Sequence, residues 1–336
     1  MHKVNWYYRI VLLLSIFLTG YGQSNLEIPL SPYNDEVIHH SAYSLGYCEE
    51  HEQARWVAYE LTATELSGNQ QRKDNFRADP SVSTMSASLA DYRGSGYDRG
   101  HLAPAADMKL NSNYMSESFY MSNMSPQKPG FNRGVWKNLE GVVRKMALGC
   151  RAVYVVTGPI FVSNKGSIGS NQATVPGYYY KVILDYREPT FRAIGFILPN
   201  EPSSKTLSSF AVCVDAVEAR TGLDFFAALP DALESQLESR FKYADWNVKD
   251  VTSSRTKSKT CAGITKSGNR CMRVVKGEDT YCFQHKPSVS STPPSIKPST
   301  TSDNRCQALT QKGTQCKRKA KAGSRYCWQH EKHTQN

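Results

Sequence analysis

The segment Tyr97–Pro104 (YDRGHLAP) concentrates side chains that could act on a phosphate ester. The imidazole of His101 has an ordinary pKa of about 6.5, so it can accept a proton from water at physiological pH. Arg99 carries a permanent charge that can contact a phosphate oxygen. The string Asp-Arg-Gly-His is weak evidence when taken alone, because aspartate and glycine are common turn residues. It becomes informative only if other chemical groups accompany it.

Such groups follow in Ser122–Gln127 (SNMSPQ) and Phe131–Glu140 (FNRGVWKNLE). If a helix begins at Asn132, the spacing brings Trp136 and Glu140 onto the same face, within about 80° of Asn132. An amide carbonyl and a carboxylate are oxygen ligands of the kind that Mg²⁺ prefers. Two alternatives stay open: Asn132 as a helix N-cap only, and Glu140 as an ordinary acid on the helix surface.

In this order, the linked motifs resemble the DNA/RNA non-specific endonucleases, the ββα-metal nucleases that include mitochondrial endonuclease G. The resemblance extends from Arg55 to Leu198 and includes the later Val155–Pro159 (VVTGP). It implies a role for each matching residue: His101 as general base, Asn132 as the single direct protein ligand to Mg²⁺ (or Mn²⁺), Glu140 as the acid that holds the water shell of the metal, Arg99 as a phosphate contact, Asn123 and Gln127 as polar groups around the site, and Arg77 as a second arginine near the scissile phosphate.

The C-terminal part contains a duplicated pattern of three cysteines and one histidine. Three thiolates and one imidazole form a complete tetrahedral zinc set, and segments this short cannot bury enough surface to fold unaided. We therefore expect two structural Zn²⁺ ions. Disulfides between the repeats are the alternative, since the six cysteines make an even number. The pattern comprises Cys261, Cys271, Cys282 and His285, repeated 45 positions later as Cys306, Cys316, Cys327 and His330.

The net charge of +11 also belongs to this tail, because residues 251–336 carry +13 and residues 1–250 carry −2. A basic surface can bind the nucleic-acid backbone or another anionic surface. The aromatic residues of the repeats could stack on bases, but we favour a role as the small core of each module. They are Tyr281, Phe283, Tyr326 and Trp328.

The N-terminus has the pattern of a secretory signal. Basic residues precede the apolar run Ile10–Leu18, and Gly20 and Gly22 offer a cleavage site before Gln23. The run is too short for a bilayer, which needs about 20 residues. We expect cleavage and a secreted or periplasmic protein with no membrane segment afterwards; an uncleaved anchor or a buried N-terminal helix is the alternative.

The region between signal and tail has a mixed α/β pattern. Short runs rich in β-branched and aromatic residues predict strands, and apolar residues at helical spacing predict helices. The predicted fold class is α+β, a ββα-metal nuclease core with a mixed or antiparallel central sheet, flanking helices and two small Cys/His modules. Strands are predicted at Ala54–Leu61, Ala152–Thr157, Tyr178–Asp185 and Phe191–Leu198, and helices at Val135–Leu148, Leu207–Arg220 and Asp231–Phe241.

This organisation predicts a signal peptide over residues 1–22, an endonuclease domain over 23–250, a linker over 251–260, repeat 1 over 261–286, a Ser/Thr/Pro linker over 287–304 and repeat 2 over 305–331. Cys48, Cys150 and Cys213 are scattered, so we expect core residues or one disulfide pair and no cysteine nucleophile.

The expected function is Mg²⁺-dependent, non-specific hydrolysis of DNA and RNA, and the resemblance implies 5′-phosphate products. The alternative is a binding protein for nucleic acid or anionic polymers whose nuclease fold is inactive. The sequence leaves the oligomeric state open, a dimer included.

Overall fold

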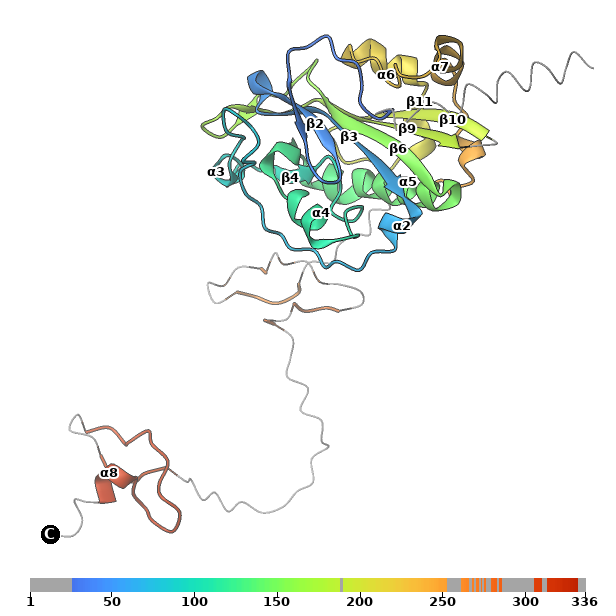
Figure 1. Ribbon diagram of the computed structural model, residues 1–336. Coiled ribbons are helices and arrows are strands. Elements are labelled where there is room, and N and C mark those ends of the chain that lie inside the picture. The colour runs from blue at the N-terminus through green and yellow to red at the C-terminus, as the bar shows by residue number, and fades with distance from the viewer. Residues whose placement is uncertain are drawn as a thin grey trace, which may run out of the picture. The chain divides into compact units, whose positions relative to one another are not determined.

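The computed structural model describes residues 26–187 and 190–252, together with 261–265, 268, 270–271, 273, 275, 279–282, 284–285, 305–309 and 313–331 (Figure 1). The predicted signal peptide and the Ser/Thr/Pro linker lie outside these residues. The chain divides into two compact units, residues 1–257 and 258–336. Each is considered by itself below.

The first unit is built on a seven-stranded sheet in which every neighbouring pair of strands is antiparallel. The order across the sheet is β1-β2-β3-β6-β9-β10-β11. Long central strands rich in valine, isoleucine and tyrosine suit a sheet that is covered on both faces. The strands are β1 (Glu36–His39), β2 (Ser44–Cys48), β3 (Gln53–Thr62), β6 (Ala152–Ile160), β9 (Tyr178–Arg187), β10 (Thr190–Pro199) and β11 (Ala211–Val212).

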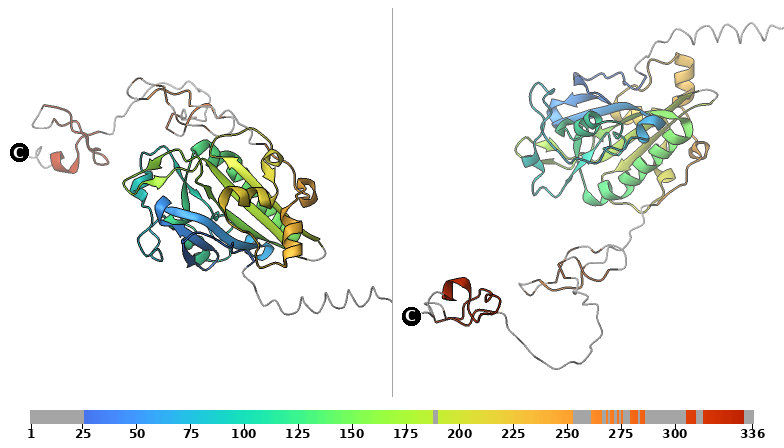
Figure 2. Two further views of the ribbon diagram at one scale, coloured as in Figure 1. Left: turned by 90° about the horizontal axis from the view of Figure 1, so that it is seen from above. Right: turned by 60° about the horizontal axis from the view of Figure 1, so that its bottom comes forward.

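Helices cover the sheet on its two faces, as Figures 1 and 2 show. Because side chains alternate along a strand, Val155 belongs to the core cluster under α5 (Lys137–Cys150), whereas Val156 belongs to the core on the opposite face, under α6 (Val214–Thr221). A Cβ at Gly195 on β10 would lie 2.7 Å from Cγ2 of Val217, so glycine there permits the close approach of α6. The remaining helices of this unit are α2 (Ala63–Leu66), α3 (Leu89–Tyr92), α4 (Ser112–Glu117) and α7 (Asp231–Glu238), with 3-10 turns at Glu49–His51, Met121–Asn123, Leu207–Phe210 and Tyr243–Trp246.

A separate two-stranded hairpin carries the Asp-Arg-Gly-His motif. β4 (Asp98–His101) pairs antiparallel with β5 (Met124–Gln127). A π-helical turn over Phe131–Trp136 then leads directly into α5. This hairpin and the following helix form the β-β-α unit that the fold class requires. A second small pair joins β7 (Ser167–Ile168) to β8 (Ala173–Thr174).

The predicted fold class is confirmed, and all four predicted strands are present with slightly longer bounds. The helix predicted over Leu207–Arg220 is wrong in its first half. Residues Leu207–Phe210 form a 3-10 turn, and Ala211 and Val212 pair with β10, so the α-helix begins only at Val214. Pairing with the sheet edge thus prevails over the helical pattern at these positions.

Two further helix predictions need smaller corrections. The helix predicted from Val135 begins at Lys137, after the π-helical turn, and that predicted to Phe241 ends at Glu238. Within the described residues, no helix combines the length and apolar character needed to cross a membrane.

Candidate active site and cysteine-histidine modules

A cleft of about 450 Å³ brings the predicted catalytic groups together. Its walls come from β4 with the loop that follows it, from the π-helical turn and from the first two turns of α5. The surroundings are strongly cationic, as a site for a polyanion requires. The lining residues include His101, Asn132 and Glu140 together with Arg72, Arg99, Arg133, Lys137 and Arg144.

His101 ends strand β4 and is buried, with an exposed fraction of 8%. Its ring meets the rings of Phe76 and Phe119 edge-on, at centroid distances of 5.8 and 5.1 Å. Nε2 is buried and has no hydrogen-bond partner. Burial, together with the charges of Arg72 and Arg99, lowers the pKa of His101 to about 3. The imidazole is therefore neutral at physiological pH and retains a nitrogen that can accept a proton.

Asn132 lies in the π-helical turn, where its side chain is held by Asp98, the first residue of the Asp-Arg-Gly-His motif. Nδ2 of Asn132 donates to Oδ2 of Asp98 at 2.9 Å. This bond uses the amide nitrogen and leaves the carbonyl oxygen, Oδ1, as the available acceptor. Asp98 also accepts from Nε of Arg133 at 2.8 Å. The amide of Asn132 is thus oriented with an oxygen available to a hard cation, which supports the predicted ligand role.

Glu140 lies one helical turn into α5 and faces a buried charge network. Burial raises its pKa, and the nearby ammonium of Lys181 opposes that rise. Lys181, on β9, is fully buried; its Nζ lies 4.9 Å from the centroid of the Trp136 ring and has no hydrogen-bond partner. Beside them, Nη1 of Arg144 donates to Oδ1 of Asp107 at 2.7 Å. The charged form of a carboxylate in such a buried site is stabilised by a nearby cation.

Four arginines line the cleft, and two of them, Arg72 and Arg99, stack on the rings that contact His101. Arg72 is not the arginine predicted from the sequence. The guanidinium of Arg99 stacks on Phe76, 4.2 Å from the ring centroid, and that of Arg72 lies 4.9 Å from the centroid of Phe119. Arg77 is absent from the cleft lining, because its guanidinium donates to the carbonyl oxygen of Ser116 at 2.8 Å and stacks on a tyrosine. Arg72 therefore replaces Arg77 as the candidate second arginine.

Asn123 and Gln127 are buried behind the cleft and do not line it. Asn123 accepts from the backbone N–H of Ala103 at 2.8 Å and donates to its carbonyl oxygen at 2.9 Å, which fixes the loop after His101. Gln127 packs under Gly100, where a Cβ would lie 2.2 Å from Cδ of Gln127. Both residues thus hold the motif in position from its buried side. The close contact with Gln127 leaves no room for a side chain at position 100, which explains the glycine there.

The sequence reasoning missed Arg72 and the role of Asp98. Arg72 stands in a polar segment without apolar periodicity, so no local signal distinguishes it from the neighbouring Arg77. Asp98 belongs to the Asp-Arg-Gly-His motif, and carboxylates commonly orient the ligands of metal sites, so the motif itself carried this signal.

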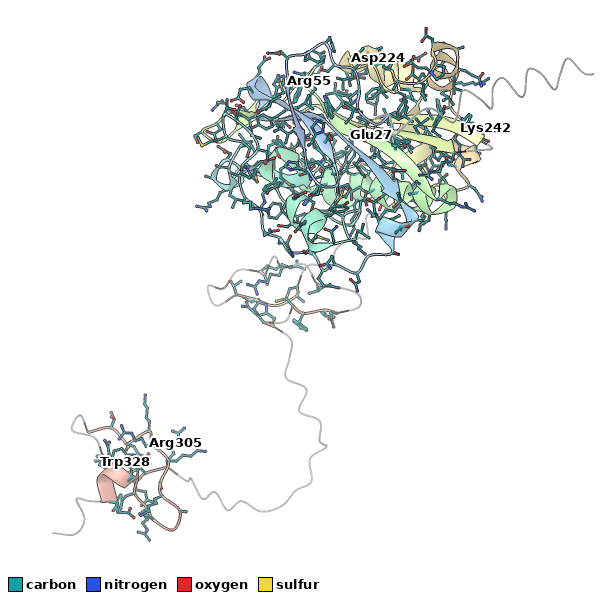
Figure 3. All side chains as sticks on the ribbon, viewed as in Figure 1. Glu27, Arg55, Asp224, Lys242, Arg305 and Trp328 are labelled. Atoms are coloured by element: carbon teal, nitrogen blue, oxygen red, sulfur yellow. The ribbon has the colours of Figure 1, made fainter. Side chains whose placement is uncertain are left out.

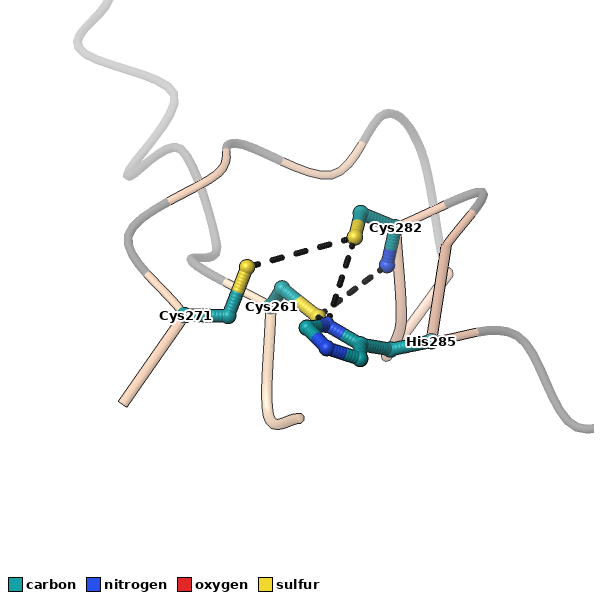
Figure 4. A group of neighbouring side chains, drawn as sticks. All are labelled: Cys261, Cys271, Cys282 and His285. Carbon is teal, nitrogen blue, oxygen red and sulfur yellow. Dashed lines mark hydrogen bonds between the residues drawn. The ribbon is translucent and has the colours of Figure 1, made fainter. Parts of the chain in front are cut away.

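The first tail module gathers all four predicted ligands (Figure 4). One ligand atom from each lies within 4.8 Å of the other three. Sγ of Cys261 lies 3.3 Å and Sγ of Cys282 3.5 Å from Nδ1 of His285, and Sγ of Cys271 lies 4.0 Å from that of Cys282. Tetrahedral zinc with Zn–S bonds of about 2.3 Å separates two sulfurs by about 3.8 Å, whereas a disulfide requires about 2.05 Å.

The second module repeats this arrangement. Cys306 and Cys327 place Sγ at 3.3 and 3.5 Å from Nδ1 of His330, and Cys316 completes the group. Tyr281 and Tyr326 pack against their cysteine clusters, as expected for small cores. Trp328 instead is 63% exposed, with the guanidinium of Arg318 5.9 Å from its ring centroid (Figure 3). Phe283 lies outside the described residues.

Cys48, Cys150 and Cys213 are all free thiols. Burial raises the pKa of Cys48 and of Cys150 to about 11. The thiols of Cys48 and Cys150 therefore stay protonated at neutral pH, which makes them poor nucleophiles.

Comparison with known proteins decides the family. Residues 23–232 match the family model described as DNA/RNA non-specific endonuclease. The chain belongs to this family. It is therefore a nuclease, a hydrolase of a metal-dependent family whose substrates are nucleic acids.

Several relatives resemble this nuclease over the first unit. Nuclease C1 of Cunninghamella echinulata var. echinulata is 40% identical over 211 residues, which cover 58% of this chain and 84% of the relative. The mitochondrial nuclease EXOG of Danio rerio is 39% identical over 55% of this chain and 59% of its own. Human mitochondrial endonuclease G is 36% identical over 55% of this chain and 67% of its own. Among solved structures, the EndoG/EndoGI complex, which concerns the inhibition of EndoG, matches with a TM-score of 0.56 and 34% identity, over 59% of this chain and 89% of that chain.

These relatives correct the expected destination. The N-terminal pattern predicted a secreted or periplasmic protein, but EXOG, endonuclease G and nuclease 1 of Schizosaccharomyces pombe are mitochondrial by name. The names of these relatives point to mitochondria and not to secretion, so the predicted export is wrong by this comparison. A short apolar run after basic residues is a weak discriminator, because mitochondrial targeting segments are also basic and amphipathic.

Proposed function

We propose that this nuclease cleaves DNA and RNA phosphodiester bonds without sequence preference, using His101 as general base and Asn132 as ligand to Mg²⁺ (or Mn²⁺). The observation that carries this proposal is the cleft that brings His101, Asn132 and Glu140 together with Arg72 and Arg99. The products are expected to bear 5′-phosphates.

His101 receives a proton from a water molecule, whose oxygen attacks phosphorus. The P–O3′ bond then breaks, its electron pair goes to O3′, and a proton from solvent water completes the 3′-hydroxyl. Arg72 and Arg99 hold the non-bridging oxygens and match the charge of the transition state. Burial and, to a smaller extent, these arginine charges keep the imidazole neutral in the free enzyme. The arginines that contact the phosphate therefore also influence the protonation of the general base.

The donor set fits a hard divalent cation. Asn132 offers a carbonyl oxygen oriented by Asp98, and Glu140 offers a carboxylate that can hold the waters of the ion. When bound, Mg²⁺ supplies positive charge to the phosphate and the departing oxygen. Both side chains offer oxygen ligands, which are the ligands that a hard cation prefers over thiolate or imidazole.

Supercoiled plasmid degradation tests this assignment. His101→Ala and Asn132→Ala should each lower the rate by about 100-fold or more, since a base and a metal ligand both act in the reaction. His39→Ala and Asn113→Ala, at exposed positions outside the cleft lining, are matched controls and should retain full rates. Full activity in either cleft variant would refute the roles, as would wild-type activity that persists in EDTA.

Each tail module is proposed to hold one structural Zn²⁺ through three cysteines and one histidine. The support is the ligand spacing, together with the absence of disulfides among the described cysteines. Elemental analysis of the purified full-length chain should give two zinc ions per molecule. His285→Ala and His330→Ala should each lose one, whereas zinc-free protein with oxidised cysteines would refute the assignment.

The second module is further proposed to bind nucleic acid. Trp328 exposes a ring on which a base can stack, next to exposed Lys317, Arg318, Lys319 and Lys321. This charge raises the local concentration of substrate but performs no chemistry. Single-stranded DNA should therefore bind less tightly to Trp328→Ala, by about 10-fold given the usual energy of one stacked base. Unchanged affinity would exclude stacking.

A further inference from the structure

A second group of acidic side chains lies on the opposite face of the sheet from the cleft. It is formed where α6 meets α7 (Figure 1). Asp215 and Glu218 are three residues apart on α6 and so project to the same side of that helix. Glu238 is the last residue of α7. One carboxylate oxygen from each of the three lies within 4.8 Å of the other two.

Glu238 is the informative member of this group. Its exposed fraction is 5%, and its Oε1 is buried with no hydrogen-bond partner. A buried carboxylate oxygen normally accepts a hydrogen bond or contacts a cation. Among the described residues, no lysine or arginine forms an ion pair with Glu238, Glu218 or Asp215. A buried carboxylate with an unpartnered oxygen therefore belongs to a purely acidic cluster.

Two more acids increase the negative charge. Glu234, one turn before Glu238 on α7, also has a buried Oε1 without a partner. Asp224, on the loop between the helices, lies beside α6 in Figure 3 and acts electrostatically on Glu218 and Glu238. Burial and these neighbouring carboxylates raise the pKa of Glu238 to about 9. The arrangement is unfavourable unless protons or a cation neutralise it.

The spacing fits a large, hard cation. Three oxygens that lie mutually within 4.8 Å can all be within about 2.8 Å of one point, so small rotamer changes reach the Ca²⁺–O range of about 2.3–2.6 Å. Mg²⁺ needs about 2.0–2.1 Å and near-ideal octahedral geometry, which two separate helices supply less readily. Glu218 is already anchored, since its Oε1 accepts from the backbone N–H of Phe225 at 2.8 Å.

We propose that Asp215, Glu218 and Glu238 form a calcium site that joins α6 to α7. The site is structural. It lies against the core cluster of Val214 and Val217, whereas the catalytic cleft belongs to the face covered by α5. Calcium binding therefore stabilises the fold and takes no part in phosphodiester cleavage.

The test is calcium-dependent thermal unfolding of the full-length chain, stripped with EGTA, at pH 7.5 without magnesium. The Asn132→Ala background removes the candidate metal ligand of the cleft, and the Cys/His modules, as soft sites, do not compete for Ca²⁺. Saturating Ca²⁺ should raise the unfolding temperature by about 5 °C or more, and Mg²⁺ at the same concentration by much less.

Glu238→Gln in that background should abolish the calcium shift, while Glu50→Gln, at an exposed position, should retain it. Because the pKa of Glu238 is raised, its side chain is uncharged at pH 7.5 without calcium, and Gln has the same shape and charge; without calcium the variant should therefore unfold close to the temperature of its parent. That comparison separates loss of the site from loss of the fold. A calcium shift of equal size in Glu238→Gln, or no shift in the parent, would overturn the proposal and leave shared protons as the neutralising species.

Discussion

Asp98→Ala tests whether the orientation of Asn132 controls metal binding. The substitution removes the acceptor that holds Nδ2 of Asn132 at 2.9 Å. The amide is then free to turn its nitrogen toward the cleft, where a cation would be repelled. A hydrogen bond to a charged group contributes about 1.5–3 kcal/mol, equivalent to about 10- to 150-fold in an equilibrium constant. Removing a residue that orients a metal ligand lowers metal affinity by a similar amount, about 10- to 100-fold.

The assay is the initial rate of plasmid nicking as a function of Mg²⁺ concentration. We expect the half-saturating Mg²⁺ concentration to rise about 10-fold or more in Asp98→Ala. Asp98→Asn should show a smaller rise, because its amide oxygen still accepts. Arg133→Gln removes the other partner of Asp98, but that side chain is 72% exposed and should contribute little.

Two results would refute this reasoning. The first is Asp98→Ala with the rate and Mg²⁺ dependence of the wild type. The second is Arg133→Gln with a loss as large as that of Asp98→Ala, which would assign the effect to the surface ion pair. Circular dichroism and the unfolding temperature of each variant show whether the fold is retained.

Three further predictions concern the cleft and the tail. Burial and two neighbouring arginines lower the pKa of His101 to about 3. As the pH falls below about 6.5, His101 is protonated in the unfolded chain but not in the folded one, which favours unfolding. Between pH 7 and 5, urea unfolding should therefore show the wild type losing about 2 kcal/mol of stability relative to His101→Gln. A difference that stays constant over this pH range would contradict the prediction. Arg72→Gln should lower kcat/KM about 10-fold at unchanged stability. Arg77→Gln loses its hydrogen bonds to Ser116, so it should cost about 1–3 kcal/mol of stability and keep its activity. The reverse pattern would show that Arg77, and not Arg72, contacts the substrate. Lys319→Gln with Lys321→Gln should reduce the salt slope of duplex binding by up to about 2, and an unchanged slope would exclude phosphate contacts by these residues.

The positions of the long elements followed from local patterns. Tyr178–Leu184 is a run of aromatic and aliphatic residues interrupted only by Lys181, and the strand continues to Arg187. Short strands such as β4 and β11 lack such a pattern, because they exist only through pairing with a partner distant in the chain. Leu207–Arg220 shows the consequence: helical spacing over its first half was outweighed by hydrogen bonds to β10.

For this protein, the sequence alone determined the order of motifs, the candidate base and metal ligand, and the duplicated Cys/His sets. These are read from residue types at fixed spacing within short segments. Tertiary structure alone decided that Arg72 and not Arg77 reaches the cleft, that Asp98 orients Asn132, and that Glu238 completes an acidic cluster with residues of another helix. The physical reason is the range of the interactions: spacing along the chain fixes which face a residue occupies, but only packing fixes which distant side chain it meets.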